Sequence, residues 1–469
     1  MKIQIFILGV ILFSFSGFSQ QTYTLEKCLD IAFTNNFDLK GMKLKAESSQ
    51  VNLNQSWGTI MPSLNGNYNL GINNGRSIDP FTNGYINQQL TFSNAGLSAS
   101  IPVFNGFRLK NTIKQSYLNL RASEMEFEEA KQNLTVRITL AYLQVLNMRD
   151  VLELNQARLE VTKKQVDRLA VLYNEGQGNP ADYTDMKGQL ANDEVSLIAS
   201  KNALKQSIAE LFLLMGLDSD FNASFENIEM LSDFVSYPMT DEAIYNEALQ
   251  NLATFKAKEL REHAAKSGVS VAKASFAPEI YVFGQLNTNY SSAAQMFNEI
   301  GISTVETGDF VTIGGQPYNV MANRPQYEYS SIGYRDQFDN NLSTSYGLGV
   351  SIPLFNGFKA KNNVKLSKIA LEQSQIELQS TKLQYKQSIE LAYADMEAAL
   401  GKYQTLEHQV EVFEESFRVN EVRFNNGVSN VIEYIISKNN LDAAKQNLSM
   451  ARYEYVLRTK VLDYYRGDF

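Results

Sequence analysis

Residue types that carry catalysis or bind metals are sparse in this sequence of 469 residues. Its two histidines are His263 and His408, and neither stands in a metal-ligand spacing. We find no glycine-rich phosphate cradle and no nucleophile elbow. The single cysteine, Cys28, forms no internal disulfide, and we interpret it as a small packed hydrophobe. The sequence therefore predicts no enzyme, no cofactor and no metal site.

The acidic residues of most interest follow two glycine-containing turns. Asp182 comes six residues after Gly176, with Asp185 close behind, and Glu433 comes six residues after Gly427. Carboxylates that several copies of a chain bring to one axis repel one another and select for cations. A carboxylate just after a turn also stabilises the positive end of a helix dipole. The residues alone leave both interpretations open.

Each turn lies between two segments with helical periodicity. After Arg108 the apolar residues alternate steps of four and three, which is the spacing of a heptad seam between helices that pack side by side. We expect two long antiparallel helical hairpins, at 108–215 and 359–465, whose longer helices measure on the order of 100 Å. The predicted seams of the return helices are Leu190, Leu197, Leu204 and Leu211 in the first hairpin and Leu441, Leu448, Tyr455 and Leu462 in the second.

Two nearly identical heptapeptides mark the points where strands give way to these helices. Residues 101–107 and 352–358 agree at six of their seven positions, and both contain Pro, Asn and Gly. Proline ends a strand ladder because it lacks the N–H donor, and Asn-Gly starts a new chain direction. Before each heptapeptide small and apolar residues alternate, as they do in strands. The predicted strands are 64–72, 95–104, 279–290 and 343–355.

The two heptapeptides lie 251 positions apart, and the same offset relates the residues downstream of them. Upstream the offset is 216, so an insertion of 35 residues separates Pro278 from Ile352. A constant offset over so many positions indicates an internal tandem repeat. Each copy is predicted to begin with one helix, at about 24–60 and 240–276. The expected organisation is a signal peptide at 1–19, a first repeat at 20–235 and a second repeat at 236–469.

The amino terminus has the pattern of a signal peptide. Lys2 precedes an apolar run that ends near Ser19, and the run is shorter than the roughly 20 residues that a spanning helix needs. A membrane anchor is the alternative. The formal charge is −9, which argues against a nucleic-acid partner. We interpret one acidic run as solvated helix surface; it comprises Glu124, Glu126, Glu128 and Glu129.

The predicted strands have one apolar face and one small or polar face. This alternation over about ten residues is typical of a transmembrane barrel, and a soluble sandwich would show a similar pattern. Four strands in a barrel would leave two unpaired edges that lipid does not tolerate, and barrels need at least eight strands. The chain must then oligomerise, with two copies giving eight strands and three giving twelve. The predicted aromatic girdle at the membrane boundary is Phe104, Phe107, Phe355 and Phe358.

The tandem repeat, the Ile-Pro-x-Phe-Asn-Gly-Phe heptapeptides and the acidic turn motifs make the chain similar to the TolC family of outer-membrane efflux and secretion channels. The resemblance covers essentially the whole mature chain. It implies a mainly helical fold with a membrane β-barrel, in which three copies share twelve strands and their helical hairpins form a periplasmic α-barrel. It also implies an outer-membrane location in contact with lipid, a periplasmic adaptor and an inner-membrane transporter. A periplasmic adaptor or scaffold without a pore is the rival interpretation.

The resemblance also suggests roles for the turns. It implies a periplasmic gate in which Glu433 forms a ring, and Asp182 and Asp185 are further candidates. The second gate acid of the family is Ile436 here, and the basic residue that often follows the turn is Ser429. The enlarged loop at 291–342 is expected to be an extracellular cap. The expected adaptor-docking residues are Gly176, Gln177, Asn179, Gly427, Val428 and Ser429.

Overall fold

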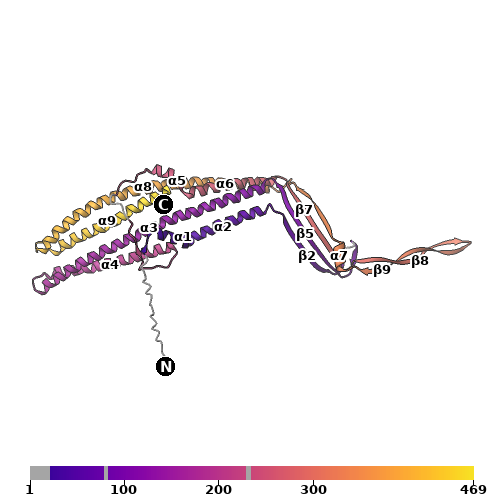
Figure 1. Cartoon of the computed structure of the whole chain (residues 1–469), viewed down its shortest axis with the longest axis horizontal. Coiled ribbons are helices and arrows are strands. Elements are labelled where there is room, and N and C mark those ends of the chain that lie inside the picture. Colours follow the sequence, from indigo (N-terminus) through magenta and orange to yellow (C-terminus); the bar gives the residue numbers. More distant parts are fainter. Residues whose placement is uncertain (1–21, 79–82, 229–233, 469) are drawn as a thin grey trace, which may run out of the picture. The chain divides into compact units, whose positions relative to one another are not determined.

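The computed structural model describes residues 22–78, 83–228 and 234–468 (Figure 1). The predicted signal peptide lies outside these residues. The chain divides into two compact units: a helical unit of residues up to 51, 117–264 and 371–469, and a mainly β unit of residues 52–116 and 265–370. Among the helices of the described residues, none contains a stretch apolar enough to cross a bilayer.

Two antiparallel hairpins make up most of the helical unit. In the first, α3 (Arg108–Asn174) is followed by α4 (Pro180–Met215); in the second, α8 (Lys359–Asn425) is followed by α9 (Val431–Arg466). Strand β1 (Thr22–Tyr23) pairs with β6 (Ser224–Phe225). Buried apolar residues of α1, α3 and α4 form one core, and those of α5, α8 and α9 form a second.

The helices expected at 24–60 and 240–276 are each broken, so the prediction of single helices was wrong. The first is α1 (Leu25–Asn35) and α2 (Phe37–Gly58), and the second is α5 (Asp241–Asn251) and α6 (Ala253–Lys273), followed by a short 3₁₀ turn. Asn36 causes the first break with its buried side chain, which accepts a bond from Leu39 N and donates one to Leu214 O. The Asn36 amide caps α2 and also binds α4. The spacing of apolar residues could not predict such a polar contact.

Two further predictions about the helices need correction. Glu126 is not solvated, because its carboxylate lies 2.8 Å from Lys45 Nζ and 2.9 Å from an Arg261 nitrogen. In α4 the predicted leucine seam is only half-buried until its last member, Leu211. The residues buried instead are Met186, Gln189, Asp193, Ser200 and Ser207.

A four-stranded antiparallel sheet forms the centre of the β unit. Its order is β10 (Ser343–Ser351), β7 (Glu279–Ser291), β5 (Leu90–Asn105) and β2 (Ser63–Asn73), so β10 and β2 are the edges. The last strand ends at 351 and not at the predicted 355. A small ribbon of β3 (Arg76–Ile78) and β4 (Tyr85–Asn87) lies between β2 and β5 in the chain.

The register gives the sheet two chemically different faces. On the apolar face, Gly66, Leu97 and Leu286 lie side by side across three strands, and Leu348 lies beside Val282. On the opposite face, which we call the amide face, Asn67 and Asn287 flank Gly96. In all four strands Glu279, at the first position of β7, is the one charged residue.

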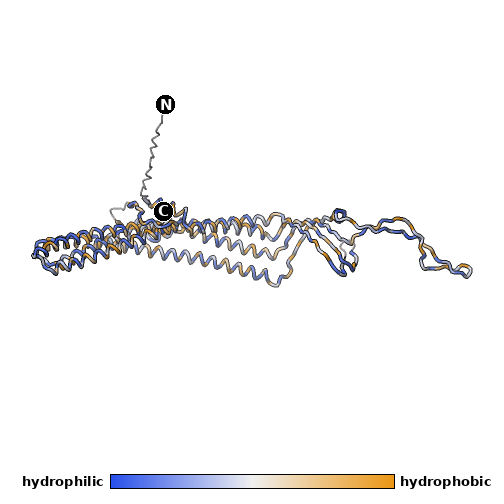
Figure 2. The backbone as a smooth tube through the Cα atoms, turned by 90° about the horizontal axis from the view of Figure 1, so that it is seen from below, coloured by the Kyte–Doolittle hydropathy of each residue, from blue (hydrophilic) through white to orange (hydrophobic). Residues whose placement is uncertain are grey.

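The inserted segment folds as a ribbon rather than as the irregular loop that its composition suggests. Strand β8 (Gln295–Ile313) pairs with β9 (Gln316–Ser331), and helix α7 (Tyr334–Asn340) leads from the ribbon to β10. Hydrophobic and hydrophilic residues follow one another closely along both strands (Figure 2). Phe297 and Tyr329 pack edge to face across the ribbon while each stays more than half exposed.

Candidate functional site at the helical tips

The two hairpin turns have matching backbone conformations. Gly176 and Gly427 both adopt the left-handed region, with φ of 73° and 71°. Gly178 N and Gln177 N donate to the Leu172 carbonyl at the end of α3, and Val428 N donates to a carbonyl at the end of α8. These bonds satisfy carbonyl groups at the end of each helix that have no partner within the helix. Glycine is the favoured residue in such a turn because it adopts the left-handed conformation without strain.

Asparagine begins the return helix in both hairpins. Asn179 Oδ1 accepts a hydrogen bond of 3.1 Å from Ala181 N, and Asn430 Oδ1 accepts one of 2.8 Å from Glu433 N. Both side chains satisfy amide groups that the first turn of a helix leaves without partners. The start of each return helix is therefore fixed by an N-cap of the same type.

The predicted gate acids differ in their surroundings. Ser429 donates a hydrogen bond of 2.6 Å to Glu433 Oε2, and Arg423 Nη1 lies 3.8 Å from the same oxygen. The Glu433 side chain is 48% exposed, which leaves room for a further partner. Asp182 accepts a hydrogen bond of 3.2 Å from Asn179, and Asp185 is exposed. Glu433 and Asp182 thus each have a partner in their own hairpin.

The predicted docking residues are mostly accessible. Gly176, Gln177, Asn179 and Gly427 are exposed, whereas Ser429 is half-buried because it binds Glu433. Val428 is 68% exposed, so an apolar side chain stands at the tip of the second hairpin without cover from its own chain.

An apolar cluster joins the two hairpins just behind the turns. Tyr434, with no exposed surface, stacks on Phe424 with ring centres 4.9 Å apart and contacts Phe417 at 5.5 Å. Burial raises the pKa of the Tyr434 phenol to about 12. Val166 of α3 and Met186 of α4 complete this cluster from the first hairpin. Beside it, Arg168 donates a bond of 3.1 Å to the Asn425 carbonyl.

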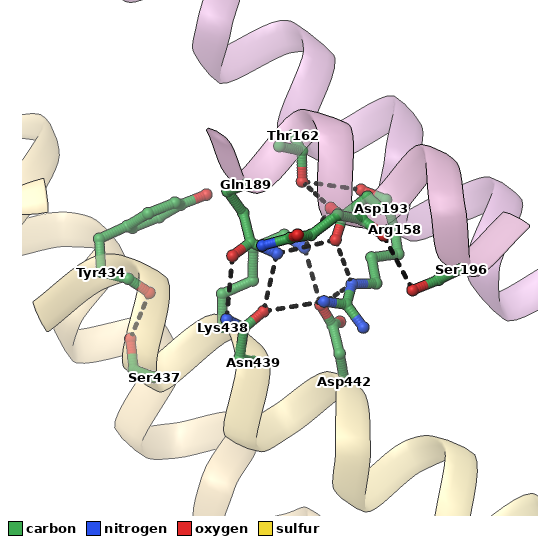
Figure 3. Close-up of polar contacts among 11 residues, drawn as sticks. Arg158, Thr162, Gln189, Asp193, Ser196, Tyr434, Ser437, Lys438, Asn439 and Asp442 are labelled. Atoms are coloured by element: carbon green, nitrogen blue, oxygen red, sulfur yellow. Dashed lines mark hydrogen bonds and ion pairs between the residues drawn. The ribbon is translucent and has the colours of Figure 1, made fainter. Parts of the chain in front are cut away.

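Further from the turns lies an ionic cluster, which we define as Arg158, Asp193, Lys438 and Asp442 (Figure 3). Asp193 is fully buried and the Lys438 side chain is 3% exposed. Lys438 Nζ lies 3.5 Å from Asp193 and 2.7 Å from Asp442. Arg158 Nε lies 2.7 Å from Asp193 Oδ1, as a charge contact without hydrogen-bond alignment, and 3.3 Å from Asp442. Two cations and two anions therefore compensate one another between the hairpins.

Neutral side chains complete the ionic cluster. Thr162 Oγ1 donates to Asp193 at 2.5 Å, and Gln189 Nε2 donates to the other oxygen at 2.8 Å. Gln189 and Asn439 also exchange hydrogen bonds of 3.1 Å between α4 and α9. Such satisfaction is what a buried ionic group requires, because a buried charge without partners is strongly destabilising.

The ionic cluster was not predicted from the sequence. Its signal is the polar residues Gln189 and Asp193, which stand three and seven positions after the buried Met186 and so continue its helical face. Searching for leucine repeats selected the adjacent, half-buried face. In α9, Lys438 likewise stands four positions after the buried Tyr434 and continues its helical face.

The two strand-to-helix junctions also share an unusual backbone. Phe107 and Phe358 both have φ of 63°, a conformation that is rare for bulky residues. Each packs edge to face on the phenylalanine three positions earlier, Phe104 at 5.5 Å and Phe355 at 5.6 Å. The aromatic pairs therefore accompany the change of direction. Their placement at a membrane boundary stays a prediction.

In the described part of the chain no group of three or more His, Cys, Asp or Glu residues is arranged to hold a metal ion. What the geometry offers is two accessible turns, held together by an apolar cluster and a buried ionic cluster, with carboxylates near their ends.

Comparison with known proteins identifies the class of the chain. Its fold is shared with the outer membrane protein VceC of Vibrio cholerae, at a TM-score of 0.75 and 16% identity over 94% of this chain and 96% of that one. The CmeC outer membrane channel of Campylobacter jejuni gives a TM-score of 0.76 at 15% identity, covering 95% of this chain and 85% of that channel. The fold is therefore that of outer-membrane channels.

The sequence gives the family. The profile of the outer membrane efflux protein family matches residues 28–217 and 244–463, and the chain belongs to this family. Outer membrane protein TolC of Escherichia coli (strain K12) is 21% identical over 452 residues, which are 95% of this chain and 82% of that protein. Outer membrane efflux protein BepC of Brucella suis biovar 1 is 21% identical over 384 residues, 82% of this chain and 72% of that protein.

The predicted resemblance to the TolC family is thereby confirmed. The chain is an outer-membrane exit duct for efflux. Channels of this family work with adaptor and inner-membrane transporter partners.

Proposed function

We propose that three copies of the chain close into one duct, with twelve strands in the outer membrane and a ring of helical hairpins in the periplasm. The observation that carries the proposal is the four-stranded sheet with free edges at β2 and β10. Neighbours in the sheet alternate in direction, so β2 of one copy and β10 of the next can pair antiparallel. Closure removes the unpaired backbone groups that lipid would not solvate.

The chemistry of the two faces supports the same arrangement. In a closed barrel the apolar face contacts lipid and the amide face lines the lumen. Leu348 and Ser345 test this, because they stand on the same edge strand and their side chains point to opposite faces. Leu348→Lys should abolish membrane insertion or destabilise the barrel by about 2–4 kcal/mol, whereas Ser345→Lys should be tolerated. Membrane fractionation and heat-modifiable migration measure both variants. Equal tolerance of the two would refute the proposed faces.

The number of copies is tested separately. Chemical cross-linking of the purified protein in detergent should give a ladder that stops at three chains. A ladder ending at two would support an eight-stranded barrel, and a folded monomer would support the rival scaffold without a pore.

We also propose that the chain is two structural repeats, 20–235 and 236–469. The helices support this, because α3 and α8 each have 67 residues and α4 and α9 each have 36. The left-handed glycines Gly216 and Gly467 end both return helices at the same offset of 251 positions. Expressing the two repeats as separate chains should restore a functional duct if each is a folding unit.

The helical tips are proposed to form the periplasmic gate and the adaptor dock. Three copies of Glu433 around one axis would place carboxylates close enough to favour cations, with Asp182 and Asp185 as further contributors. Val428 supports the docking role, because it is an apolar side chain exposed at a tip. Val428→Asp should reduce efflux in cells without reducing the amount of trimer, whereas Gln177→Asp, a polar exchange at the other tip, should reduce it less. A loss of trimer in Val428→Asp would indicate a folding role instead.

The β8–β9 ribbon is proposed to cover the outer mouth of the duct. It connects β7 to β10 at the sheet end opposite the strand-to-helix junctions. Protease added to whole cells should cut near Gly314 and Gly315, the turn of the ribbon, while the helical tips stay intact. Cleavage that requires permeabilised cells would reverse the proposed orientation.

A further inference from the structure

Helix α7 is clamped onto the apolar face of the sheet at the end where β7 leaves it. Gln337, 1% exposed, accepts a hydrogen bond of 2.9 Å from Ser291 N and returns one of 3.0 Å to Ser291 O. Asn341 donates to the Asn289 carbonyl at 2.9 Å. Thr288 Oγ1 donates to the Phe338 carbonyl at 2.7 Å. These bonds fix α7 against β7 by side chains and by backbone groups.

Aromatic contacts fix the other end of α7 on the same face. The Tyr334 hydroxyl lies 3.2 Å from the Tyr68 hydroxyl of β2 and 3.1 Å from Ser93 Oγ of β5. The Tyr334 ring packs on Tyr290 at 4.8 Å and stacks on Phe338 at 4.5 Å. The helix therefore lies across β2, β5 and β7, and it is held by the buried Gln337 at one end and by the partly exposed Tyr334 at the other.

Between α7 and the sheet remains a cavity of about 480 Å³, which we call the notch. Leu97 and Leu286 form its floor with Ala95 and Gly66, and Phe338 and Leu342 form its wall. Its lining contains no charged residue. The volume lies within the range of roughly 300–1,000 Å³ that is typical of ligand sites. An elongated hydrocarbon packs favourably against such apolar walls, whereas a polar ligand would lose its hydrogen bonds to water without gaining others.

Charged residues of α7 point away from the notch. Arg335, Asp336 and Asp339 are exposed, while the residues between them face the sheet. A short helix with charged residues on its outer surface and the Phe338 ring on its inner surface suits the level where lipid headgroups meet hydrocarbon. The notch then opens below the headgroups, toward the hydrocarbon side of the same sheet face.

We propose that the notch binds one acyl chain of a lipid of the surrounding membrane. The inference rests on the proposed function, which places the apolar face in contact with lipid. The notch is continuous with that face through Leu97 and Leu286, so a tail reaches it without crossing a polar barrier. A bound tail covers the apolar floor that α7 leaves open and holds the inserted segment at the membrane surface.

A neighbouring copy is the competing occupant. Copies are proposed to associate through the edge strands β2 and β10. One side of the notch, at Gly66 and Tyr68, belongs to β2, but Ala95, Leu97 and Leu286 belong to the central strands β5 and β7. Pairing at the edge leaves the centre of the apolar face uncovered. Lipid therefore fits the position of the notch better than a second chain.

The test uses the full trimer in phosphatidylethanolamine vesicles that contain phosphatidylethanolamine with a diazirine at the end of one acyl chain. After irradiation, mass spectrometry maps the adducts to residues. We expect labelling at Phe338 and Leu342 to exceed that at Leu348, on the open apolar face, by several-fold. Ala95→Phe fills the floor of the notch and should reduce this labelling to the level of Leu348. Ala99→Phe, on the same strand and face but outside the notch, should leave it unchanged.

The outcomes separate the inference from the proposed function. Labelling of Leu348 without excess at Phe338, or excess that survives Ala95→Phe, would overturn the acyl-chain site while leaving the barrel in place. An absence of labelling from the whole apolar face would show that the sheet is not in lipid and would refute the proposed function. Heat-modifiable migration confirms that each variant is an assembled trimer before it is labelled.

Discussion

The hairpins α3–α4 and α8–α9 have the same lengths, turns and caps, but they differ in the charges that they bury. The ionic cluster takes Arg158 and Asp193 from the first hairpin, whereas the positions 251 residues later are Gln409 and Ala444. It takes Lys438 from the second, where the counterpart Lys187 is exposed and lies 5.3 Å from the Tyr183 ring centre. Shared backbone signals thus specify the hairpin, and unshared charges specify how one hairpin recognises the other.

This comparison is tested most severely at Asp193. Asp193→Asn leaves Lys438 and Arg158 buried with one carboxylate between them, so we expect a loss of about 3–5 kcal/mol in the free energy of unfolding. Chemical denaturation followed by circular dichroism measures the change. Asp185→Asn, an exposed exchange on the same helix, is the matched control and should have little effect.

A double variant sharpens the same test. Asp193→Leu with Lys438→Met removes one cation and one anion together, and a buried pair replaced by apolar residues is often neutral. The pair should therefore be much less destabilised than Asp193→Asn. If both variants lose the same stability, the shape of the site matters more than its charge balance.

The next largest difference in stability is expected between the two strand-to-helix junctions, which have the same backbone conformation but different surroundings. Gly106 and Gly357 have φ of 64° and 60°, so alanine at either position costs roughly 1–2 kcal/mol. At Gly106 a new Cβ would also lie 2.4 Å from the Ala277 Cβ, whereas at Gly357 it would meet nothing within 4 Å. Gly106→Ala should lose about 1–3 kcal/mol more than Gly357→Ala. Thermal unfolding of the two purified variants compares them, and equal losses would mean that the environments are alike.

A smaller effect is expected at Cys28 of α1, whose counterpart in α5 is Ile244; both are fully buried. Burial raises the pKa of the Cys28 thiol to about 12. The unfolded thiol titrates near 8.5, so the stability that Cys28 contributes is complete below that pH and falls as the pH rises toward 12. Cys28→Val should cost less than about 1.5 kcal/mol at pH 7 and should abolish roughly 1 kcal/mol of alkaline loss near pH 9.5.

Thiol reactivity provides the control for Cys28. Iodoacetamide at pH 8 should leave the folded protein unmodified and should alkylate it after denaturation. Rapid alkylation of the folded protein would show that the α1 core opens readily.

The smallest effect on stability is expected at the tip acids. There we expect the two hairpins to differ in their contribution to cation selectivity. Glu433→Gln should reduce cation selectivity in planar bilayers by about two- to five-fold, equivalent to ~0.4–1 kcal/mol, and should weaken block by divalent cations. Asp182→Asn, the counterpart in the first hairpin, should change selectivity less. Unaltered selectivity with a lower melting temperature of Glu433→Gln would assign Glu433 to helix capping alone.

The backbone of this protein could be predicted from sequence because its signals are local. Gly176, Gly427, Asn179 and Asn430 act on their own turns, and alternation along the strands reports burial of one face at a time. The break at Asn36 and the ionic cluster could not be predicted in this way, because their partners are distant in sequence: Asn36 binds the Leu214 carbonyl, and Asp193 meets Lys438 across 245 positions. A polar residue at a core position indicates that a partner exists but does not identify it.

The fold of the inserted segment could not be predicted from the sequence for a related reason. In the sequence, nothing distinguishes Gln337 from other polar residues. In the structure, its side chain hydrogen-bonds both backbone groups of Ser291 and thereby positions α7. The segment 291–342 was interpreted as a loop because it is rich in Asn and Gly.

Because α3 and α8 have equal lengths, the two hairpin tips lie equally many residues from their strand-to-helix junctions. At 1.5 Å per residue, 67 residues measure about 100 Å, and both helices reach the same apolar cluster at Tyr434. One added residue would turn the tip by about 100° and remove Phe424 or Val166 from that cluster. Seven residues would restore the face with a drift of about 20° and extend the helix by about 10 Å. Lengthening the duct would therefore require all four hairpin helices to be lengthened together, in steps of two turns.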